Sequence, residues 1–138
     1  MDKNYFTELY NIDVHGKIKQ KNGLNYVPWA AAWAELKKIH PDADYDIAGQ
    51  TFNTTETIDG KTKTTSYIRK WFDDGKSGWV EVTVTVGDVA HTVILPIMDL
   101  RNKSIPANNI TVLEANKAIM RALTKACAMH GMGLYVYE

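Results

Sequence analysis

The 138-residue chain has a single cysteine, no net charge and no apolar run near the roughly 20 residues that a membrane-spanning helix needs. The lone Cys127 excludes an intramolecular disulfide and fits a reducing cytoplasm. The first five residues lack the basic and then apolar form of a signal peptide. Because 45% of the residues are hydrophobic and 23% charged, we expect one cytoplasmic domain over residues 1–138.

Catalytic and metal-binding motifs are missing as well. The sequence has no Gly-rich phosphate loop ending in Lys-Ser or Lys-Thr, no Gly-x-Ser-x-Gly and no His-Glu-x-x-His. Its four histidines lack metal-ligand spacing. The acids Asp42, Asp44 and Asp46 are spaced like the start of a calcium loop, but Ile47 stands where that loop needs Gly. We therefore expect no enzyme, no cofactor and no metal site.

The last long helical pattern, residues 111–130, is the most informative segment. Thr111 and Glu114 form a capping box that predicts its start, and Gly131 predicts its end. Apolar residues cover most of the circumference, which predicts a helix buried on two sides. The polar seam that remains consists of Glu114, Lys117, Arg121, Thr124 and Lys125. This seam indicates either a groove that holds an anion or a solvated Lys/Arg edge.

Periodicity and turn signals predict the other elements. Helices are expected over residues 2–11 and 28–40, the second with Trp29, Trp33, Leu36 and Ile39 on one core-facing stripe. Between them, residues 14–26 are expected to hold a short strand or hairpin whose Lys17, Lys19 and Lys21 share one face.

The middle of the chain changes to a period of two. Strands are expected over residues 44–52 and 62–72 with a turn near Asp59-Gly60, and over 79–86 and 89–97 with a turn at Gly87-Asp88. A loop is expected over residues 98–110. This order predicts an α+β fold with helices packed on one face of a curved antiparallel sheet. Exposed edge strands make a homo-oligomer plausible.

Aromatic and basic residues alternate in one expected strand. Tyr67, Arg69 and Trp71 would share a face, where rings and a guanidinium can stack on bases and contact phosphate. Tyr and Trp also favour strands that fill a core. The two interpretations differ in whether Ile68 and Phe72 face inward, which would turn the other three outward.

Several segments together carry a family resemblance. They are GLNYVPWAAAWAE (23–35), PDA (41–43), LPIMD with RNK (95–103), NKAIMRALTKA (116–126) and HGMGLY (130–135). Through them the chain resembles the Sak-type phage single-strand annealing proteins, relatives of the Rad-fifty-two superfamily. The terminal helix with its Gly-x-Gly-Leu-Tyr ending is the most specific part.

The resemblance implies a β-β-β-α core that assembles into rings or filaments. Single-stranded DNA would lie in a basic groove with its bases exposed, and complementary strands would pair there without ATP. It further implies DNA recombination and repair by a bacteriophage in the cytoplasm of its bacterial host, with a phage exonuclease or a host single-strand binding protein as partner. Many members carry a polar C-terminal tail, so a chain ending at Glu138 fits a trimmed core.

The family's DNA contacts carry over only in part. Eukaryotic relatives have Lys-Arg-Ala-Leu where residues 120–123 read Met-Arg-Ala-Leu. Arg121 is therefore expected to contact backbone phosphate, with Lys117 and Lys125 compensating for Met120. An arginine of those relatives falls on Ala31 and does not transfer.

Other phosphate contacts are expected from the loop before this helix, at Arg101 and Lys103. Neutralising phosphates would make binding sensitive to salt. Two other classes of function stay open: a plain single-stranded DNA-binding protein that protects strands without annealing them, and a protein-interaction scaffold. The scaffold would show exposed apolar surface and no salt-sensitive DNA affinity.

Overall fold

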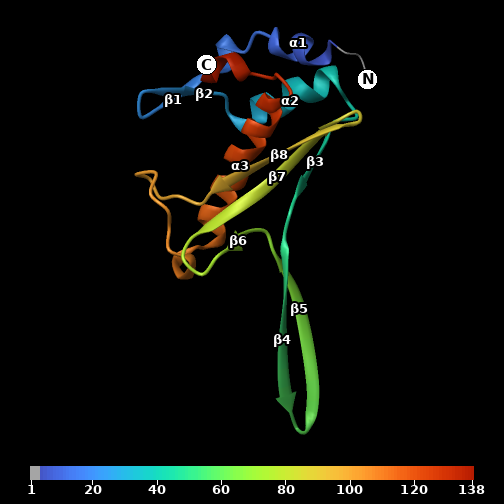
Figure 1. Cartoon of the computed structure of the whole chain (residues 1–138), viewed down its shortest axis with the longest axis vertical. Coiled ribbons are helices and arrows are strands. Elements are labelled where there is room, and N and C mark those ends of the chain that lie inside the picture. The colour runs from blue at the N-terminus through green and yellow to red at the C-terminus, as the bar shows by residue number, and fades with distance from the viewer. Residues whose placement is uncertain (1–3) are drawn as a thin grey trace.

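The computed structural model describes residues 4–138, whose path is traced in Figure 1. The helices of this part are α1 (Tyr5–Tyr10), α2 (Trp29–Ile39) and α3 (Val112–Met129), with 3₁₀ turns η1 (His15–Lys17), η2 (Ala107–Asn109) and η3 (Leu134–Tyr137). The strands are β1 (Lys19–Lys21), β2 (Leu24–Tyr26), β3 (Asp44–Ile47), β4 (Gln50–Ile58), β5 (Lys61–Arg69), β6 (Phe72–Asp73), β7 (Gly78–Val86) and β8 (Val89–Pro96). No helix within residues 4–138 is long and apolar enough to cross a membrane.

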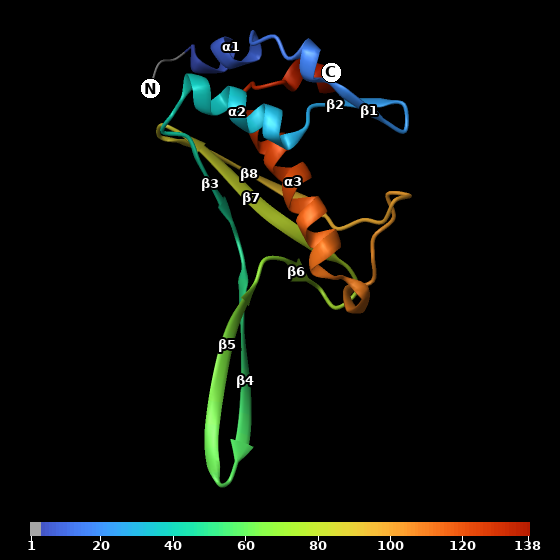
Figure 2. The same cartoon turned by 180° about the vertical axis from the view of Figure 1, so that it is seen from behind.

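Strand β7 is the centre of an antiparallel sheet. It pairs with β8 along one side and with β3 and the short β6 along the other. The turn at Gly87-Asp88 brings Val86 opposite Val89, as the sequence predicted. Helix α3 packs on β7 and β8 from one face, and Figures 1 and 2 show no helix of the described residues on the other. The prediction of an α+β fold with the last helix on an antiparallel sheet is confirmed.

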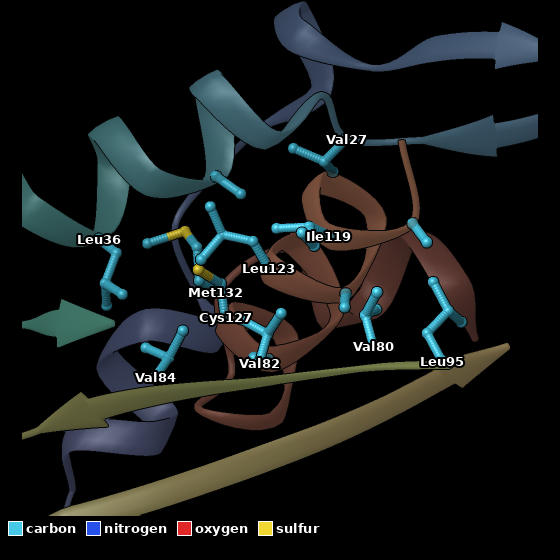
Figure 3. Close-up of a cluster of buried hydrophobic side chains, with 14 of the residues drawn as sticks. Val27, Leu36, Val80, Val82, Val84, Leu95, Ile119, Leu123, Cys127 and Met132 are labelled. Carbon is cyan, nitrogen blue, oxygen red and sulfur yellow. The ribbon is translucent and has the colours of Figure 1, made fainter. Parts of the chain in front are cut away.

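The contact between α3 and the sheet is made of valine on one side and mostly alanine on the other. Successive side chains of a strand point to opposite faces, so alternate residues of β7 are fully buried: Val80, Val82, Val84 and Val86. The small side chains of α3 that are buried over them are Ala115, Ala118, Ala122 and Ala126. Larger residues of α3 fill the spaces between the layers, among them Ile119 and Leu123 (Figure 3). This packing fixes which side of α3 faces away from the sheet.

The boundaries of α3 agree with the capping signals. The backbone N–H of Thr111 donates to the Glu114 carboxylate at 2.9 Å, and the Thr111 hydroxyl donates to the same oxygen. At the other end the helix finishes at Met129, His130 is its C-cap, and Gly131 adopts a positive φ of 110°. Both termini of the predicted helix are confirmed.

The apolar arc predicted for α3 is only partly buried. Burial begins at Ala115, so Val112 and Leu113 are 71% and 64% exposed. Thr124, which the sequence placed in the polar seam, is buried. Its hydroxyl donates to the carbonyl oxygen of Met120 at 3.3 Å, which allows a polar side chain to be buried there.

The apolar stripe predicted for α2 is wrong at Trp29 and at Ile39, which is 37% exposed. Helix α2 packs on α3, and its buried residues are Ala32 and Leu36. Trp33 is half-buried, edge-on to Tyr45 with 5.3 Å between ring centroids. Trp29 lies one helical turn before Trp33 and is 45% exposed.

Two predicted strands leave the central sheet. β3 ends at Ile47, and the chain continues into the β4–β5 hairpin, which projects from the body of the protein (Figures 1 and 2). Asp59 and Gly60 have φ of 53° and 75°, the left-handed pair that a tight two-residue turn needs. The expectation that residues 44–52 and 62–72 both belong to one curved sheet is therefore wrong, because alternation alone does not show which partner a strand pairs with.

The predicted hairpin within residues 14–26 is confirmed as β1–β2, closed by Asn22-Gly23. The prediction that three lysines share its face is wrong for Lys17. That residue lies in η1 and forms an ion pair with Glu35. Lys19 and Lys21 remain on the strand.

A fully buried histidine links α3 to the sheet and to α1. The His130 Nε2 lies 2.8 Å from the carbonyl oxygen of Val84, and its Nδ1 lies 3.2 Å from the Tyr5 hydroxyl. Nε2 can only donate to the carbonyl, so the neutral ring accepts from Tyr5 at Nδ1. Burial lowers the pKa of His130, and nearby His91 and His40 act in the same direction.

Acid is therefore expected to destabilise the fold through His130. Below about pH 6.5, the ordinary pKa of histidine, the unfolded ring takes up a proton that the folded ring does not. The free energy of unfolding should fall as the pH drops from 7.5 to 5.5. In His130→Gln, which keeps an amide donor for Val84, urea titrations should show a smaller fall. Equal falls in both proteins would contradict the assignment.

Candidate nucleic-acid interface

Three cations form a strip on the exposed side of α3. We call Lys117, Arg121 and Lys125, spaced at i, i+4 and i+8, the cationic strip. Residues three and four apart lie on one face of a helix. Because the alanine face is pressed against the sheet, the strip is held away from it, with Lys117 and Arg121 exposed and Lys125 half-buried.

A groove of about 1080 Å³ opens along this strip. It is lined by α3, by β1–β2 with the start of α2, by the loop of residues 98–105 and by residues 136–138. Figures 1 and 2 show the β1–β2 hairpin and this loop reaching out on the same side of α3. The cations of its lining are Lys21, Lys117, Arg121 and Lys125. Segments far apart in the sequence thus build one basic concave surface.

Acids are also present in the groove, but each is held by other groups. Asp99 accepts backbone N–H groups of Lys103 and Arg101 at 3.0 and 2.8 Å, and these bonds lower its pKa. Glu114 is held by the capping box of α3, above all by the Thr111 hydroxyl, which lowers its pKa. The carboxylate of Glu138 accepts the hydroxyl of Tyr10 at 3.0 Å.

The groove cations, in contrast, lack a direct carboxylate partner among the described residues. Within residues 4–138, no carboxylate forms an ion pair with Lys21, Lys117, Arg121 or Lys125. The ammonium of Lys125 lies 5.4 Å from the ring centroid of Tyr137, a contact that keeps its positive charge in place. A neutral protein therefore has a local site for a chain of negative charges.

Apolar side chains flank the cations. Leu24 and Trp29 on one side and Leu100 on the other are 70%, 45% and 78% exposed, and all three line the groove. Exposed apolar residues beside cations match a ligand that has both charged and flat apolar parts. A single nucleic-acid strand, with phosphates and bases, is such a ligand.

Arg101 and Lys103 lie beside the groove rather than in its lining. They belong to the 98–105 loop, whose Leu100 and Asn102 do face the groove. The Asp99 carboxylate binds their backbone N–H groups and so fixes the turn. Both side chains are exposed. The structure thus brings them close to the cationic strip without placing them on it.

Arg69, Tyr67 and Trp71 lie elsewhere, at the base of the β4–β5 hairpin. They line a second cleft of about 530 Å³, together with Ile68, Lys70 and Val112. Arg69 donates to the Asp73 carboxylate at 2.7 Å and to the Trp71 carbonyl at 3.1 Å. Its guanidinium also lies over the rings of Phe52 and Trp71. Its charge is thus already paired within the protein.

The alternating arrangement predicted for these three residues is wrong in part. β5 ends at Arg69, so Trp71 lies beyond the strand. Ile68 is 62% exposed rather than turned inward. Tyr67 stacks on Phe52 across the hairpin, with 5.4 Å between ring centroids. Tyr67, Arg69 and Trp71 therefore line a different cleft from the one that contains the cationic strip.

The lining also contains residues that the sequence predictions missed, chiefly Lys21 and Trp29. The alternation of lysines before Asn22-Gly23 drew attention to Lys21. It did not show that Lys21 lies in the same groove as the cationic strip of α3. For Trp29 the helical period predicted a position in the core. Helix α2 packs on α3 with Leu36 buried, and this packing leaves Trp29 exposed.

A reactive thiol at Cys127 or a metal-binding cluster would supply groups for bond chemistry among residues 4–138. Cys127 is buried, which raises the pKa of its thiol to about 12, so the thiolate needed for attack does not form. No group of three His, Cys, Asp or Glu side chains among residues 4–138 could hold a metal ion.

Comparison with known families gives one match. The model of a family described as Sak Single Strand Annealing Protein matches residues 3–138. No curated protein and no solved structure matches the chain. The match includes α3 and every segment that lines the groove, and it confirms the family resemblance seen in the sequence.

Removing one cation of the strip should weaken binding to a single-stranded oligothymidine and reduce its salt dependence. If Arg121 contacts one phosphate, the slope of log K against log salt should change by about 0.7 in Arg121→Gln. The matched control is Lys38→Gln, at an exposed lysine outside the groove. Fluorescence anisotropy over a salt series measures both. A slope unchanged in Arg121→Gln, or changed equally in the control, would refute the contact.

Shortening the ring of Trp29 tests the apolar part of the groove. Stacking of a base on an aromatic side chain contributes about 1–3 kcal/mol. We expect Trp29→Ala to weaken oligothymidine binding by that amount and Trp29→Phe, which keeps a ring, to weaken it less. Titration at one fixed salt concentration measures the effect. Equal affinity of the alanine variant and the unmodified protein would show that bases do not stack there.

Proposed function

Since the chain belongs to the family of Sak single-strand annealing proteins, we propose that it binds single-stranded DNA in the groove along α3. There it anneals complementary strands without ATP, as a step of phage homologous recombination. The observation that carries the proposal is the set of groove cations, Lys21, Lys117, Arg121 and Lys125, none of which has a carboxylate partner within residues 4–138.

The cationic strip is the proposed contact for phosphates. Each phosphate that a lysine or arginine neutralises releases bound counterions, so the affinity falls as salt rises. Such contacts hold a strand in place without reading its sequence. Arg101 and Lys103, on the exposed side of the neighbouring loop, would attract the strand as it leaves the groove.

The open form of the groove supports annealing rather than storage of a strand. With phosphates on the strip, the bases turn toward Leu24, Trp29 and the solvent beyond them, where a second strand can reach their pairing edges. Annealing forms only hydrogen bonds and stacking between the strands, so it needs no nucleophile or metal from the protein. The proposal therefore fits the chemistry that this groove offers.

The length of the strip sets a limit on one copy of the chain. From Lys117 to Lys125 the helix rises about 12 Å, at 1.5 Å per residue, which is room for only a few nucleotides. Weak contacts with a short segment become strong when several sites act on one strand. The proposed function therefore includes a homo-oligomer that lines up its grooves.

An annealing assay separates this proposal from a plain single-stranded DNA-binding protein. Two complementary oligonucleotides, one carrying a fluorophore and one a quencher, are mixed without any nucleotide cofactor. We expect the protein to accelerate pairing, the acceleration to fade with added salt, and Arg121→Glu to abolish it while circular dichroism stays unchanged. Binding without acceleration would instead favour a protective single-strand binder.

A further inference from the structure

The side chain of Tyr137 contacts both walls of the groove. It belongs to η3, which packs against β2, and Figures 1 and 2 show the C-terminal end of the chain beside that strand. One wall of the groove is the β1–β2 hairpin with the start of α2, which we call the N-terminal wall, and the other is α3. Tyr137 lines the groove with them and is 40% exposed. Its hydroxyl contacts one wall and its ring contacts the other.

The hydroxyl of Tyr137 binds the N-terminal wall. It accepts the backbone N–H of Val27 at 3.2 Å. Val27 lies just past the ladder of β1 and β2 and is only 2% exposed, so its N–H needs an acceptor within the protein. The next residue, Pro28, has no N–H and is the N-cap of α2. The hydrogen bond therefore fixes the point at which the hairpin joins α2.

The ring of Tyr137 holds the last cation of the cationic strip. The ammonium of Lys125 lies 5.4 Å from the ring centroid. A lysine side chain has many rotamers, and fixing one of them costs free energy. Lys117 and Arg121 are exposed, and within residues 4–138 neither lies over an aromatic ring. Lys125 is thus the cation of the strip that the protein orients before a ligand arrives.

Close packing at Gly133 keeps η3 against the N-terminal wall. Gly133 is the N-cap of η3 and has a φ of 72°. A Cβ at this position would lie 3.3 Å from a methyl carbon of Val27. η3 therefore begins in direct contact with the residue whose N–H the Tyr137 hydroxyl accepts.

We propose that Tyr137 is a positioning residue of the DNA groove, which sets the distance between the N-terminal wall and α3. The N-terminal wall carries Lys21 and Trp29, and α3 carries the cationic strip. A strand with phosphates on the strip can reach the ring of Trp29 only while this distance is kept. Because the groove is formed before DNA binds, less free energy is spent on ordering it during binding. The inference rests on the proposed function, since it concerns the same groove.

The hydroxyl contact is tested with Tyr137→Phe, and the chain offers a matched control in Tyr135→Phe. The Tyr135 hydroxyl also accepts a backbone N–H, that of Val14 at 2.9 Å, but Tyr135 does not line the groove. We expect Tyr137→Phe to weaken binding of a short oligothymidine by about 2- to 10-fold, the range for one lost hydrogen bond. Tyr135→Phe should leave the affinity unchanged. No loss in Tyr137→Phe, or equal losses in the two variants, would overturn the positioning role.

Amide hydrogen exchange, followed by NMR without DNA, shows whether the hydroxyl holds the wall. The Val27 amide should exchange faster in Tyr137→Phe than in the unmodified chain, and at an unchanged rate in Tyr135→Phe. The Val14 amide should show the reverse. Unchanged exchange at Val27 in Tyr137→Phe would overturn the link to the N-terminal wall, whatever the DNA affinity.

The ring contact is tested by comparing Tyr137→Leu with Tyr137→Phe, because both lack the hydroxyl and only the second keeps a ring. With Lys125 present, Tyr137→Leu should bind oligothymidine about 2- to 5-fold more weakly than Tyr137→Phe, the range for an exposed cation–π contact. In the background of Lys125→Gln this difference should disappear, because the ring acts through Lys125. An equal difference in both backgrounds would mean that the ring contacts DNA directly, and would overturn its role in placing Lys125.

The positioning role and the proposed function fail in different ways. If the unmodified chain does not bind oligothymidine, the proposed function is wrong and the role of Tyr137 in it falls too. If the unmodified chain binds and both Tyr137→Phe and Tyr137→Leu bind equally well, only the role of Tyr137 is wrong.

Discussion

The close contact between the alanine face of α3 and the valine face of β7 is the constraint on which the rest of the structure depends. Small side chains such as Ala118 and Ala122 let the helix approach the sheet, and β7 offers buried valines at every second position. Rotating the helix by one residue, about 100°, would push Lys117 or Arg121 toward an apolar layer, where an unpaired charge is strongly unfavourable. The packing that buries the core therefore also fixes the direction in which the cations point.

That orientation explains how a chain without net charge acquires a basic groove. The acids nearest the strip, Glu114 and Asp99, are used by the capping box and by the turn after β8. The β1–β2 hairpin brings Lys21 to the opposite side, and Trp29 begins the helix next to it. The same elements that stabilise the fold thus hold Asp99 and Glu114 in hydrogen bonds and leave the groove cations without a carboxylate partner among the described residues.

The sequence predicted those parts of the fold that depend on neighbouring residues. The capping box at Thr111 and the turn at Gly87-Asp88 are local signals, and both are confirmed. The departure of the β4–β5 hairpin from the sheet and the exposure of Trp29 were missed. Both depend on which surface a segment meets in three dimensions, and a period of two or of 3.6 carries no such information. The cationic strip of the candidate site was therefore predictable, whereas Lys21 and the aromatic rim were not.

The most direct test of the account is a map of the lysines that DNA protects. Acetylation of the exposed lysines, followed by mass spectrometry with and without an oligothymidine, reports each side chain separately. We predict protection at Lys21, Lys117 and Lys125 and none at Lys38, which lies outside the groove. Protection at Lys38 equal to that at Lys117, or no protection along α3 while DNA is bound, would contradict the central claim that this helix presents the phosphate-binding surface.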